Sequence, residues 1–211
     1  MRVIAGRSRG RALRAPPGST TRPTADRVRE AIFDMVGSLV ELRGATVADL
    51  FAGSGAMGIE ALSRGARAVV FIDRAASALR TVRSNLAAAG LAPAPATIVR
   101  ADVLAWLSRE AAQTVRPPQR FDLALCDPPY AFVAWEELLG RLYAGVAVLE
   151  SNRPLEVPER WKVIRCKRYG GTLVTVVRAA GTRTSDESHD NDGRDAAGLR
   201  TTSDAKQRGM P

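Results

Sequence analysis

The first group of residues that could carry chemistry combines three glycines with two carboxylates. The segment Asp49-Leu-Phe-Ala-Gly-Ser-Gly-Ala-Met-Gly58 lies between a predicted strand and a predicted helix, and Gly53 and Gly55 begin a GxGxxG pattern that ends at Gly58. Glycines permit a tight turn and let a ligand approach the backbone. Asp73 ends the next predicted strand about 20 residues after Gly53, where a carboxylate can accept both hydroxyls of a ribose. The pattern predicts a site for a nucleoside-containing cofactor.

Asp49 distinguishes between two cofactors that both satisfy this pattern, NAD and S-adenosylmethionine. A carboxylate beside the glycine turn would repel a pyrophosphate, but it suits the methionine ammonium and the nearby sulfonium. S-adenosylmethionine is therefore the predicted cofactor, and we assign Phe51 of the same turn to its site. Asp102 follows the third predicted strand, where it can accept the adenine amino group or cap the helix that starts at Val103. The two roles are compatible.

The second group, Asp127-Pro-Pro-Tyr130, closes the fourth predicted strand. Two prolines cannot extend a strand, so they hold the chain rigidly just past the carboxyl edge of the sheet, where open α/β sheets bind ligands. The Asp127 carboxylate and the Pro128 carbonyl are two acceptors fixed side by side, and an exocyclic amine offers two donors. Tyr130 supplies a ring on which a base can stack. These residues predict methyl transfer to the amine of a flipped or unpaired base, with alignment and electrostatics supplying most of the rate.

Other side chains that often carry chemistry have no such role in this sequence. Cys126 is the last residue of an apolar strand, so we expect a buried small hydrophobe rather than the thiolate nucleophile of a C5-pyrimidine methyltransferase. The chain has two cysteines, neither in a CxxC pair, and one histidine, so no metal site is expected. No apolar run approaches the roughly 18 residues that span a bilayer. We expect a cytoplasmic monomer with no membrane partner.

Composition divides the chain into three zones. Residues 1–22 carry six arginines, no acid and several turn formers, and they predict either a basic hairpin or a flexible basic arm. Residues 23–179 alternate strand-like with helix-like segments, which predicts a methyltransferase domain built on a parallel sheet that is covered on both faces. Residues 180–211 are almost devoid of apolar side chains and predict a disordered tail.

The predicted elements of the middle zone follow from hydrophobic periodicity. A helix begins at a cap formed by Thr24 or Asp26 and extends to about Leu42. The predicted strands that alternate with helices cover residues 46–51, 68–72, 96–99, 121–126 and 145–150, and the helices between and after them cover residues 58–63, 75–89, 103–113 and 135–143. Residues 162–177 break the alternation, because two strands around Gly170-Gly171 predict a terminal hairpin.

The net charge of +9 indicates a polyanionic partner. GC-rich codon usage can account for the excess of arginine over lysine, but it does not explain the excess of positive over negative charge. Nucleic acid is the commonest polyanion that a soluble basic protein binds. The predicted tail is nearly neutral, so the charge belongs to the predicted folded part. Arg7, Arg9 and Arg11 in the N-terminal zone are candidate nucleic-acid contacts.

The two motifs and their order resemble those of class I methyltransferases that methylate amines. The stretches Arg2-Val-Ile-Ala-Gly6, Gly10-Arg-Ala-Leu13 and Arg22-Pro-Thr-Ala-Asp-Arg-Val-Arg-Glu-Ala-Ile-Phe33, together with Tyr169-Gly-Gly-Thr172, resemble more narrowly the bacterial 16S ribosomal RNA guanine-N2 methyltransferases of the RsmD type. The stretch from residue 22 to residue 33 is the specific part of this resemblance. The resemblance extends to about Val177, and the predicted tail departs from the family's pattern.

The resemblance implies a class I methyltransferase fold, which is a Rossmann-like α/β sheet of seven strands, mostly parallel, with a C-terminal antiparallel hairpin and a small basic N-terminal hairpin. It implies S-adenosylmethionine as cofactor, the N2 amine of guanine 966 in 16S ribosomal RNA as target, and the small ribosomal subunit as partner. Carried over by position, Asp73 would hold the ribose, Asp102 the adenine, and Asp127 with Tyr130 the target base. The residues placed near the cofactor or the RNA backbone would be Arg22, Thr24 and Arg27.

Two alternatives stay open at this point. A DNA adenine-N6 methyltransferase can use the same Asp-Pro-Pro-Tyr chemistry, although such enzymes usually add a target-recognition domain, for which no segment here is long enough. A nucleic-acid-binding protein with a vestigial cofactor fold is the alternative without catalysis. The aspartates at 49, 73, 102 and 127 are all present, which favours an enzyme.

Overall fold

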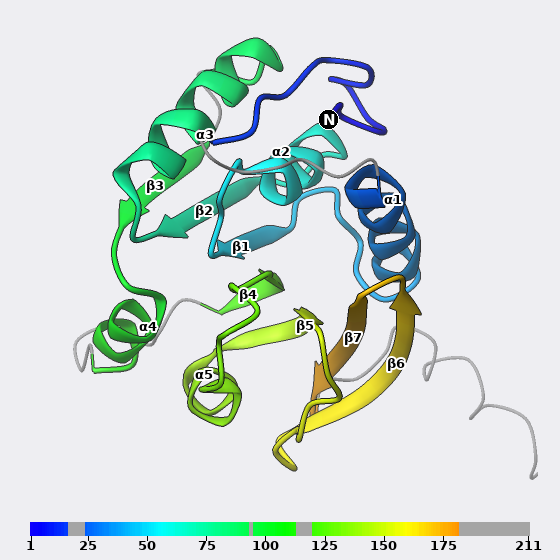
Figure 1. Ribbon diagram of the computed structural model, residues 1–211, viewed down its shortest axis with the longest axis vertical. Helices are drawn as coiled ribbons and strands as arrows, with labels where there is room; N and C mark the ends of the chain where they lie inside the picture. The colour runs from blue at the N-terminus through cyan, green and yellow to red at the C-terminus, as the bar shows by residue number, and fades with distance from the viewer. Residues whose placement is uncertain (17–23, 93–94, 113–119, 182–211) are drawn as a thin grey trace, which may run out of the picture.

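The computed structural model describes residues 1–16, 24–92, 95–112 and 120–181 (Figure 1). Among these residues, seven strands form one sheet in the order β3-β2-β1-β4-β5-β7-β6. The strands are β1 (Thr46–Leu50), β2 (Ala68–Asp73), β3 (Ala96–Arg100), β4 (Phe121–Cys126), β5 (Ala144–Ser151), β6 (Trp161–Tyr169) and β7 (Thr172–Ala179).

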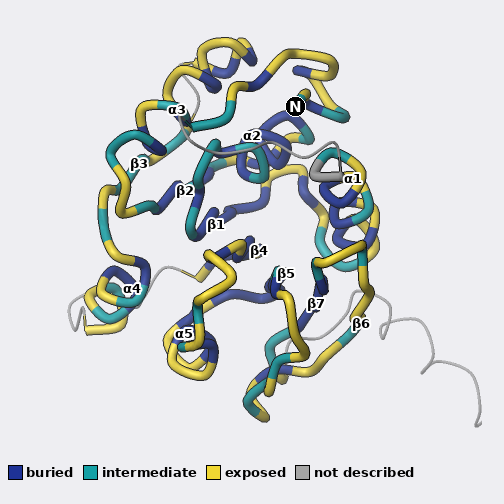
Figure 2. Tube along the Cα trace, in the orientation of Figure 1, coloured by how far each residue is buried: buried dark blue, intermediate teal, exposed yellow. Residues whose placement is uncertain are grey.

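The direction of the strands follows from the connections between them. The strands β1 to β5 run parallel to their neighbours, because a helix returns the chain across the sheet after each of the first four. A tight turn at Gly170-Gly171 joins β6 to β7, so β7 runs antiparallel both to β6 and to β5. Strand β1 lies in the middle of the sheet and all of its residues are buried (Figure 2), which explains its run of apolar side chains around Asp49.

Helices cover both faces of the sheet and bury two hydrophobic cores. One core lies under α1 (Thr24–Gly37), α2 (Ala56–Ser63) and α3 (Ala76–Ala88), and Ile32, Phe33 and Ile59 are among its most deeply buried side chains. The other lies under α4 (Val103–Ala111) and α5 (Trp135–Arg141). This three-layer arrangement leaves the carboxyl ends of the parallel strands free of covering helices, and those ends are where a doubly covered sheet binds ligands.

The predicted fold class is confirmed, and the predicted elements between residues 46 and 179 have the predicted types. The first helix was predicted to extend to about Leu42, which is wrong. The helix ends at Gly37, a turn follows at Ser38 and Leu39, and the amides of Leu39 and Val40 both donate to the Val36 carbonyl. Leu42 is nevertheless buried in the core. The apolar spacing that predicts the helix therefore continues past the residue at which the helix ends.

The N-terminal segment forms a turn with one antiparallel bridge, between Arg2 and Ala12, rather than the two short strands that were predicted. The Val3 amide donates to the Arg11 carbonyl at 3.0 Å, and the Leu13 amide donates to the Met1 carbonyl at 3.0 Å. The strand pairing is short because many backbone amides and carbonyls of this segment form hydrogen bonds with side chains of the helices beneath it.

Three buried polar side chains of helices α2 and α3 hold this segment in place. The carboxylate of Glu60, which is fully buried, accepts the amides of Ile4 and Ala5 at 2.8 and 3.0 Å. The hydroxyl of Ser63 donates to the Ala5 carbonyl at 2.5 Å. The amide group of Asn85 donates to the Arg14 carbonyl at 2.9 Å and accepts the Arg14 amide at 2.8 Å. Residues 1–14 therefore pack as part of the domain surface, and their arginine side chains are left to the solvent.

Candidate active site

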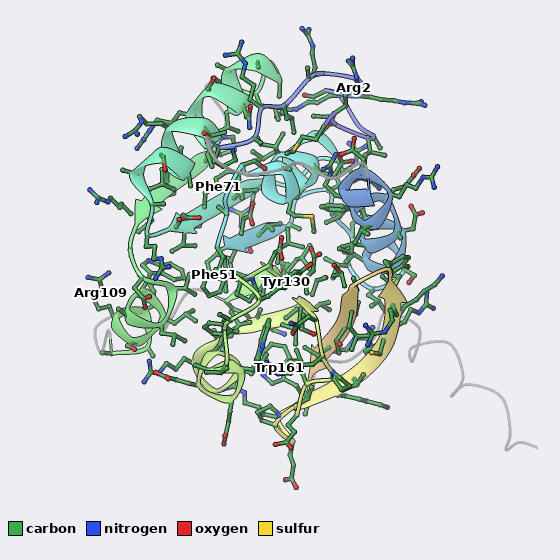
Figure 3. The ribbon with its side chains drawn as sticks, viewed as in Figure 1. Arg2, Phe51, Phe71, Arg109, Tyr130 and Trp161 are labelled. Atoms are coloured by element: carbon green, nitrogen blue, oxygen red, sulfur yellow. The ribbon has the colours of Figure 1, made fainter. Side chains whose placement is uncertain are left out.

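A cleft with a volume of about 880 Å³ lies at the carboxyl ends of the central strands. Figure 3 shows Phe51 and Tyr130 in the middle of the molecule at these strand ends, whereas Arg2 lies at its periphery. Most of the residues that the sequence assigned to the cofactor and to the target base line this cleft: Asp49, Phe51, Gly53, Asp73, Asp102, Asp127, Pro128 and Tyr130. Gly55 does not line it but starts helix α2 at its edge.

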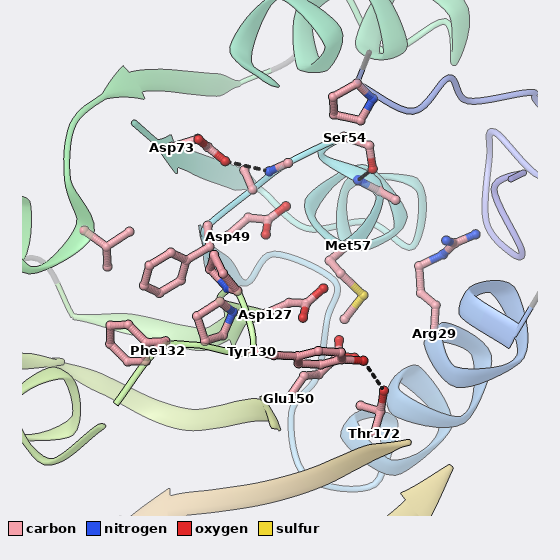
Figure 4. Close-up of a pocket in the computed structure, with 18 of the residues that line it drawn as sticks. Arg29, Asp49, Ser54, Met57, Asp73, Asp127, Tyr130, Phe132, Glu150 and Thr172 are labelled. Carbon is pink, nitrogen blue, oxygen red and sulfur yellow. Dashed lines mark hydrogen bonds between the residues drawn. The ribbon is translucent and has the colours of Figure 1, made fainter. Parts of the chain in front are cut away.

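The glycine turn between β1 and α2 is held by the carboxylate of Asp73. One oxygen of Asp73 accepts the Gly53 amide at 2.9 Å (Figure 4), and the other accepts the Ala75 amide at 2.8 Å. Gly53 and Gly55 have φ angles of 54° and 74°, and Phe51 shares this left-handed conformation with a φ of 62°. A positive φ at a phenylalanine is strained, and such strain is concentrated at functional sites.

The first and last glycines of the pattern serve different purposes. A Cβ atom on Gly53 would meet no atom closer than 3.9 Å, so its face is open toward the cleft. A Cβ atom on Gly58 would lie 2.4 Å from the Phe71 ring and 2.9 Å from the Asp49 carboxylate. Gly53 therefore leaves room for a ligand, whereas Gly58 lets helix α2 pack closely on the sheet.

The Asp49 carboxylate is buried beneath the glycine turn. It accepts the Gly58 amide at 2.9 Å at the start of helix α2, where the helix dipole is favourable to an anion. Burial raises the pKa of Asp49 to about 8, Asp127 and Asp73 raise it too, and the hydrogen bond from Gly58 opposes the rise. A buried carboxylate with this environment has a large electrostatic gain available from a cationic ligand.

Asp102 caps helix α4, which is one of its two predicted roles. Its side chain accepts the Ala105 amide at 3.1 Å and lies at the border of the cleft. Its other oxygen has no hydrogen bond among the described residues, so the adenine contact stays a prediction.

The Asp127–Tyr130 segment forms the opposite wall of the cleft. The Tyr130 hydroxyl lies 3.3 Å from the Thr172 hydroxyl at the start of β7, and the tyrosine is 49% exposed. The protein around Asp127 displaces solvent and raises the pKa of its carboxyl to about 6, although the residue is accessible from the cleft. Phe132 contacts both Phe51 and Trp135 edge to face, with centroids 5.2 Å apart in each pair, so the two walls are packed together at one end.

The sequence interpretation missed Glu150, which lines the cleft at the end of β5. Burial raises the pKa of Glu150 well above its ordinary value, Asp127 and Asp49 raise it too, and Arg29 lowers it. The interpretation also missed Arg29 and the turn from Tyr169 to Thr172, which line the cleft as well. Glu150 belongs to no recognisable motif, and the signal that could have found it is its place as the last residue of the predicted strand 145–150.

The structure separates the predicted RNA-binding arginines from the cleft. Arg7, Arg9 and Arg11 are exposed on the N-terminal segment, and Arg27 is exposed on helix α1. Arg22 lies outside the described residues, as does the side chain of Thr24. Arg29 lies two residues after Arg27 on α1. It is buried, and its side chain lines the cleft.

Cys126 is buried at the end of β4, as predicted, and burial raises the pKa of its thiol, which keeps the sulfur protonated. The described residues contain no cluster of three or more histidine, cysteine, aspartate or glutamate side chains that could hold a metal ion. In the same part of the chain, no helix has the length and apolarity needed to cross a membrane.

The strand order with β7 antiparallel, the glycine turn after β1 and the carboxylate after β2 define a class I methyltransferase fold. The solved structure of "Putative methyltransferase yhhF" from Escherichia coli has this fold, with a TM-score of 0.71, 30% sequence identity, and coverage of 85% of this chain and 97% of that chain.

The chain belongs to the family described as "Conserved hypothetical protein 95", whose pattern matches residues 1–178. The family is one of S-adenosylmethionine-dependent methyltransferases. The chain is 37% identical over 191 residues to "Putative rRNA methyltransferase YlbH" of Bacillus subtilis, covering 86% of this chain and all of that protein. It is 30% identical over 179 residues to "Ribosomal RNA small subunit methyltransferase D" of Haemophilus influenzae, covering 81% of this chain and 89% of that protein.

Proposed function

We propose that this protein transfers a methyl group from S-adenosylmethionine to the N2 amine of a guanine in 16S ribosomal RNA, at the position equivalent to guanine 966. The observation that carries the chemistry is the Asp127 carboxylate, which faces the cleft with no hydrogen-bond partner among the described residues, next to Tyr130 and opposite the glycine turn. The relatives named as ribosomal RNA methyltransferases support the choice of RNA.

The residues of the glycine turn fit S-adenosylmethionine. Gly53 leaves open space at the cleft, Asp73 stands at the end of β2 where a ribose would lie, and the buried Asp49 offers a carboxyl group close to the turn that a cationic ligand would ionise. Asp102 and Phe51 would flank the adenine. When bound, the cofactor supplies a methyl group on a positively charged sulfonium.

The second wall would orient the amine that receives the methyl group. The Asp127 carboxylate and the Pro128 carbonyl accept its two N–H groups, which turns the nitrogen lone pair away from the ring and toward the cofactor. Stacking on Tyr130, held at Thr172, fixes the plane of the base. Asp127 is also placed to take the proton that the nitrogen loses, because a pKa of about 6 leaves it ionised at neutral pH.

A base inside a helix cannot reach this cleft, so the target must be unpaired or flipped out. The exposed Arg7, Arg9 and Arg11 lie on the N-terminal segment and would contact the RNA backbone. We also propose that the protein acts as a cytoplasmic monomer on the small ribosomal subunit or its precursor RNA.

The proposal can be tested with tritiated S-adenosylmethionine and small ribosomal subunits from a strain that lacks the gene. Nucleoside analysis of the labelled RNA should give N2-methylguanosine. N6-methyladenosine in the RNA, or labelling of DNA alone, would contradict the proposed substrate. The absence of measurable S-adenosylhomocysteine binding by calorimetry would contradict enzymatic function altogether.

A further inference from the structure

Glu150 lies in the cleft with no partner that explains its presence there. Its carboxylate forms no hydrogen bond or ion pair with any described residue, although the side chain is largely shielded from solvent. A shielded carboxylate without a partner is destabilising, because it loses hydration and gains nothing in return. A residue of this kind at the end of a strand is better explained by a ligand than by the fold.

The pairing register places Glu150 beside Asp127. In the parallel pair of β4 and β5, Cys126 lies opposite Leu149, so Asp127 and Glu150 each follow that pair by one residue. Adjacent strands lie roughly 4.8 Å apart, and equivalent positions on neighbouring parallel strands face the same side of a sheet. Figure 4 shows both carboxylates at the cleft, close to Tyr130.

Arg29, whose charge lowers the pKa of Glu150, does not pair with it directly. The guanidinium of Arg29 donates to the Asp26 carboxylate at 3.2 Å and to the Arg2 carbonyl, and its Nε lies 3.9 Å from the Glu60 carboxylate. Arg29 therefore anchors helix α1 and the N-terminal segment, and it acts on Glu150 only as a nearby charge. The carboxyl group of Glu150 is therefore left to bind a ligand.

Two neighbouring acceptors match one edge of guanine. The Watson–Crick edge of guanine carries the N2 amine next to N1–H, so it presents donors to adjacent acceptors. Adenine carries its amine next to N1, which is a lone-pair acceptor and would face a carboxylate with repulsion. A site built to bind an N–H group rejects an analogue that lacks it much more strongly than a hydrophobic pocket rejects a change in size.

We propose that the Glu150 carboxylate accepts the N1–H of the target guanine while Asp127 and Pro128 hold its N2 amine, so that Glu150 makes the site specific for guanine. This inference rests on the proposed function and assigns base selection to a residue outside the Asp127–Tyr130 motif. The inference explains why two carboxylates without protein partners, Asp127 after β4 and Glu150 on β5, lie side by side: one guanine offers N2–H to the first and N1–H to the second.

The test replaces the target guanine by 2-aminopurine, which keeps the N2 amine but has a lone pair at N1 in place of N1–H. The probe is 16S ribosomal RNA assembled by ligation with either base at the position that the methylation experiment identifies. The measured quantity is the ratio of kcat/KM for the guanine RNA to that for the 2-aminopurine RNA at pH 8. A role in folding or in cofactor binding would lower both values together and leave the ratio unchanged.

The wild type should favour guanine strongly. The Glu150→Ala substitution should lower kcat/KM on guanine by about 10- to 100-fold, which corresponds to the loss of one charge-assisted hydrogen bond, with little change on 2-aminopurine. The Glu150→Gln substitution offers an amide donor to the lone pair at N1, so it should raise activity on 2-aminopurine and reduce the ratio at least 10-fold. The Glu156→Gln substitution at an exposed position outside the cleft is the matched control and should leave the ratio unchanged.

If the kcat/KM ratio of Glu150→Gln stays within about threefold of the wild-type ratio, the inference is overturned. If Glu150→Ala does not fold, the result for Glu150→Gln alone tests the inference. The affinity of each variant for S-adenosylhomocysteine should equal that of wild type. Equal affinity shows that the substitution has left the cofactor site intact. Failure of the proposed function gives a different result, because the wild type would then methylate neither RNA.

Discussion

The two halves of the cleft treat their carboxylates in opposite ways. On the cofactor side, backbone amides bind all three aspartates: Gly58 donates to Asp49, Gly53 and Ala75 donate to Asp73, and Ala105 donates to Asp102. On the substrate side, neither Asp127 nor Glu150 has a hydrogen-bond partner among the described residues.

The difference shows which part of the site is complete before a ligand arrives. The aspartates of the cofactor side shape the turn and the helix start, so they stabilise the fold as well as the ligand. Burial raises the pKa of both carboxyls on the substrate side, Asp127 also raises that of Glu150, and under the proposed function both contribute only when a donor binds. Substitutions on the two sides should therefore separate effects on stability and cofactor affinity from effects on turnover.

The largest expected effect is that of Asp127→Ala, which removes the acceptor that we propose for the transition state. We expect kcat to fall by about 10²- to 10³-fold or more, as for loss of other preorganised electrostatic groups. Affinity for S-adenosylhomocysteine should stay within about twofold of wild type, as measured by calorimetry. Unchanged turnover in this variant would contradict the division into one wall for cofactor binding and one for methyl transfer.

The same carboxyl predicts an acid limb in the pH profile. The pKa of Asp127 is raised to about 6, so the group becomes protonated and loses an acceptor site as the pH falls through 6. In wild type, log kcat/KM should therefore decrease below about pH 6. The Asp127→Asn variant, whose side chain does not titrate, should lack that limb, and its persistence would assign the limb to another group.

The next effect concerns Asp49, whose removal should affect the cofactor side alone. The Asp49→Asn substitution keeps an oxygen for the Gly58 amide but removes the carboxyl group that a cationic ligand would ionise, so S-adenosylhomocysteine affinity should fall by roughly 10-fold or more, the size of a charge-assisted contact. Because the folded pKa of about 8 lies above the unfolded value of 3.8, the folded state binds more protons between these pH values.

Wild-type stability should consequently decrease as the pH rises from about 4 to 8, and the decrease should be smaller in Asp49→Asn. Thermal unfolding of the ligand-free proteins across this range checks the slope. Equal slopes in wild type and variant would contradict the assignment of a buried, proton-binding carboxyl to position 49.

A pair of glycine substitutions tests the cofactor side at smaller scale. In Gly58→Ala, the new methyl group would clash with Phe71 and Asp49, so we expect a loss of about 1–3 kcal/mol in the free energy of unfolding, typical of overpacking. In Gly53→Ala, the methyl group would point into open space at the cleft but the φ of 54° would be strained, so stability should fall by about 1 kcal/mol and cofactor affinity should fall by more. The reverse pattern, measured by denaturant unfolding and calorimetry, would contradict the two roles.

The smallest expected effect lies outside the cleft. Replacing Arg7, Arg9 and Arg11 by glutamine should weaken RNA binding several-fold at low salt and reduce the dependence of affinity on salt concentration, since fewer counterions are released. Cofactor affinity should not change, because the segment is anchored through backbone groups and Glu60 rather than through these side chains. Filter binding at a series of salt concentrations measures the slope, and an unchanged slope would place the RNA elsewhere.

The cofactor side was predictable because its partners are close in sequence. Asp49 and Gly58 belong to one turn, and Asp73 reaches that turn from the next strand, so a local motif contains the geometry. The layered fold was predictable for the same reason, since each strand and helix has its own period. Glu150 could not be identified in this way, because its place beside Asp127 depends on the register between two strands more than 20 residues apart.

Two other features depended on tertiary contacts. The N-terminal segment has little strand pairing because the side chains of Glu60, Ser63 and Asn85 form hydrogen bonds with its backbone. Its own sequence does not predict those partners. Leu42 continued the apolar spacing of α1 although the helix had ended, because a buried loop residue gives the same signal as a buried helical one.

The position of β7 between β5 and β6 has a consequence for how the protein is made. Synthesis delivers β6 before β7, yet β6 pairs only with β7 in the described sheet. Strand β6 therefore cannot join the described sheet until β7 has been synthesised, after the parallel strands have emerged. Thr172, whose hydroxyl lies beside that of Tyr130, arrives with this last step, so a nascent chain can have a formed glycine turn while the wall proposed to bind the base is still incomplete.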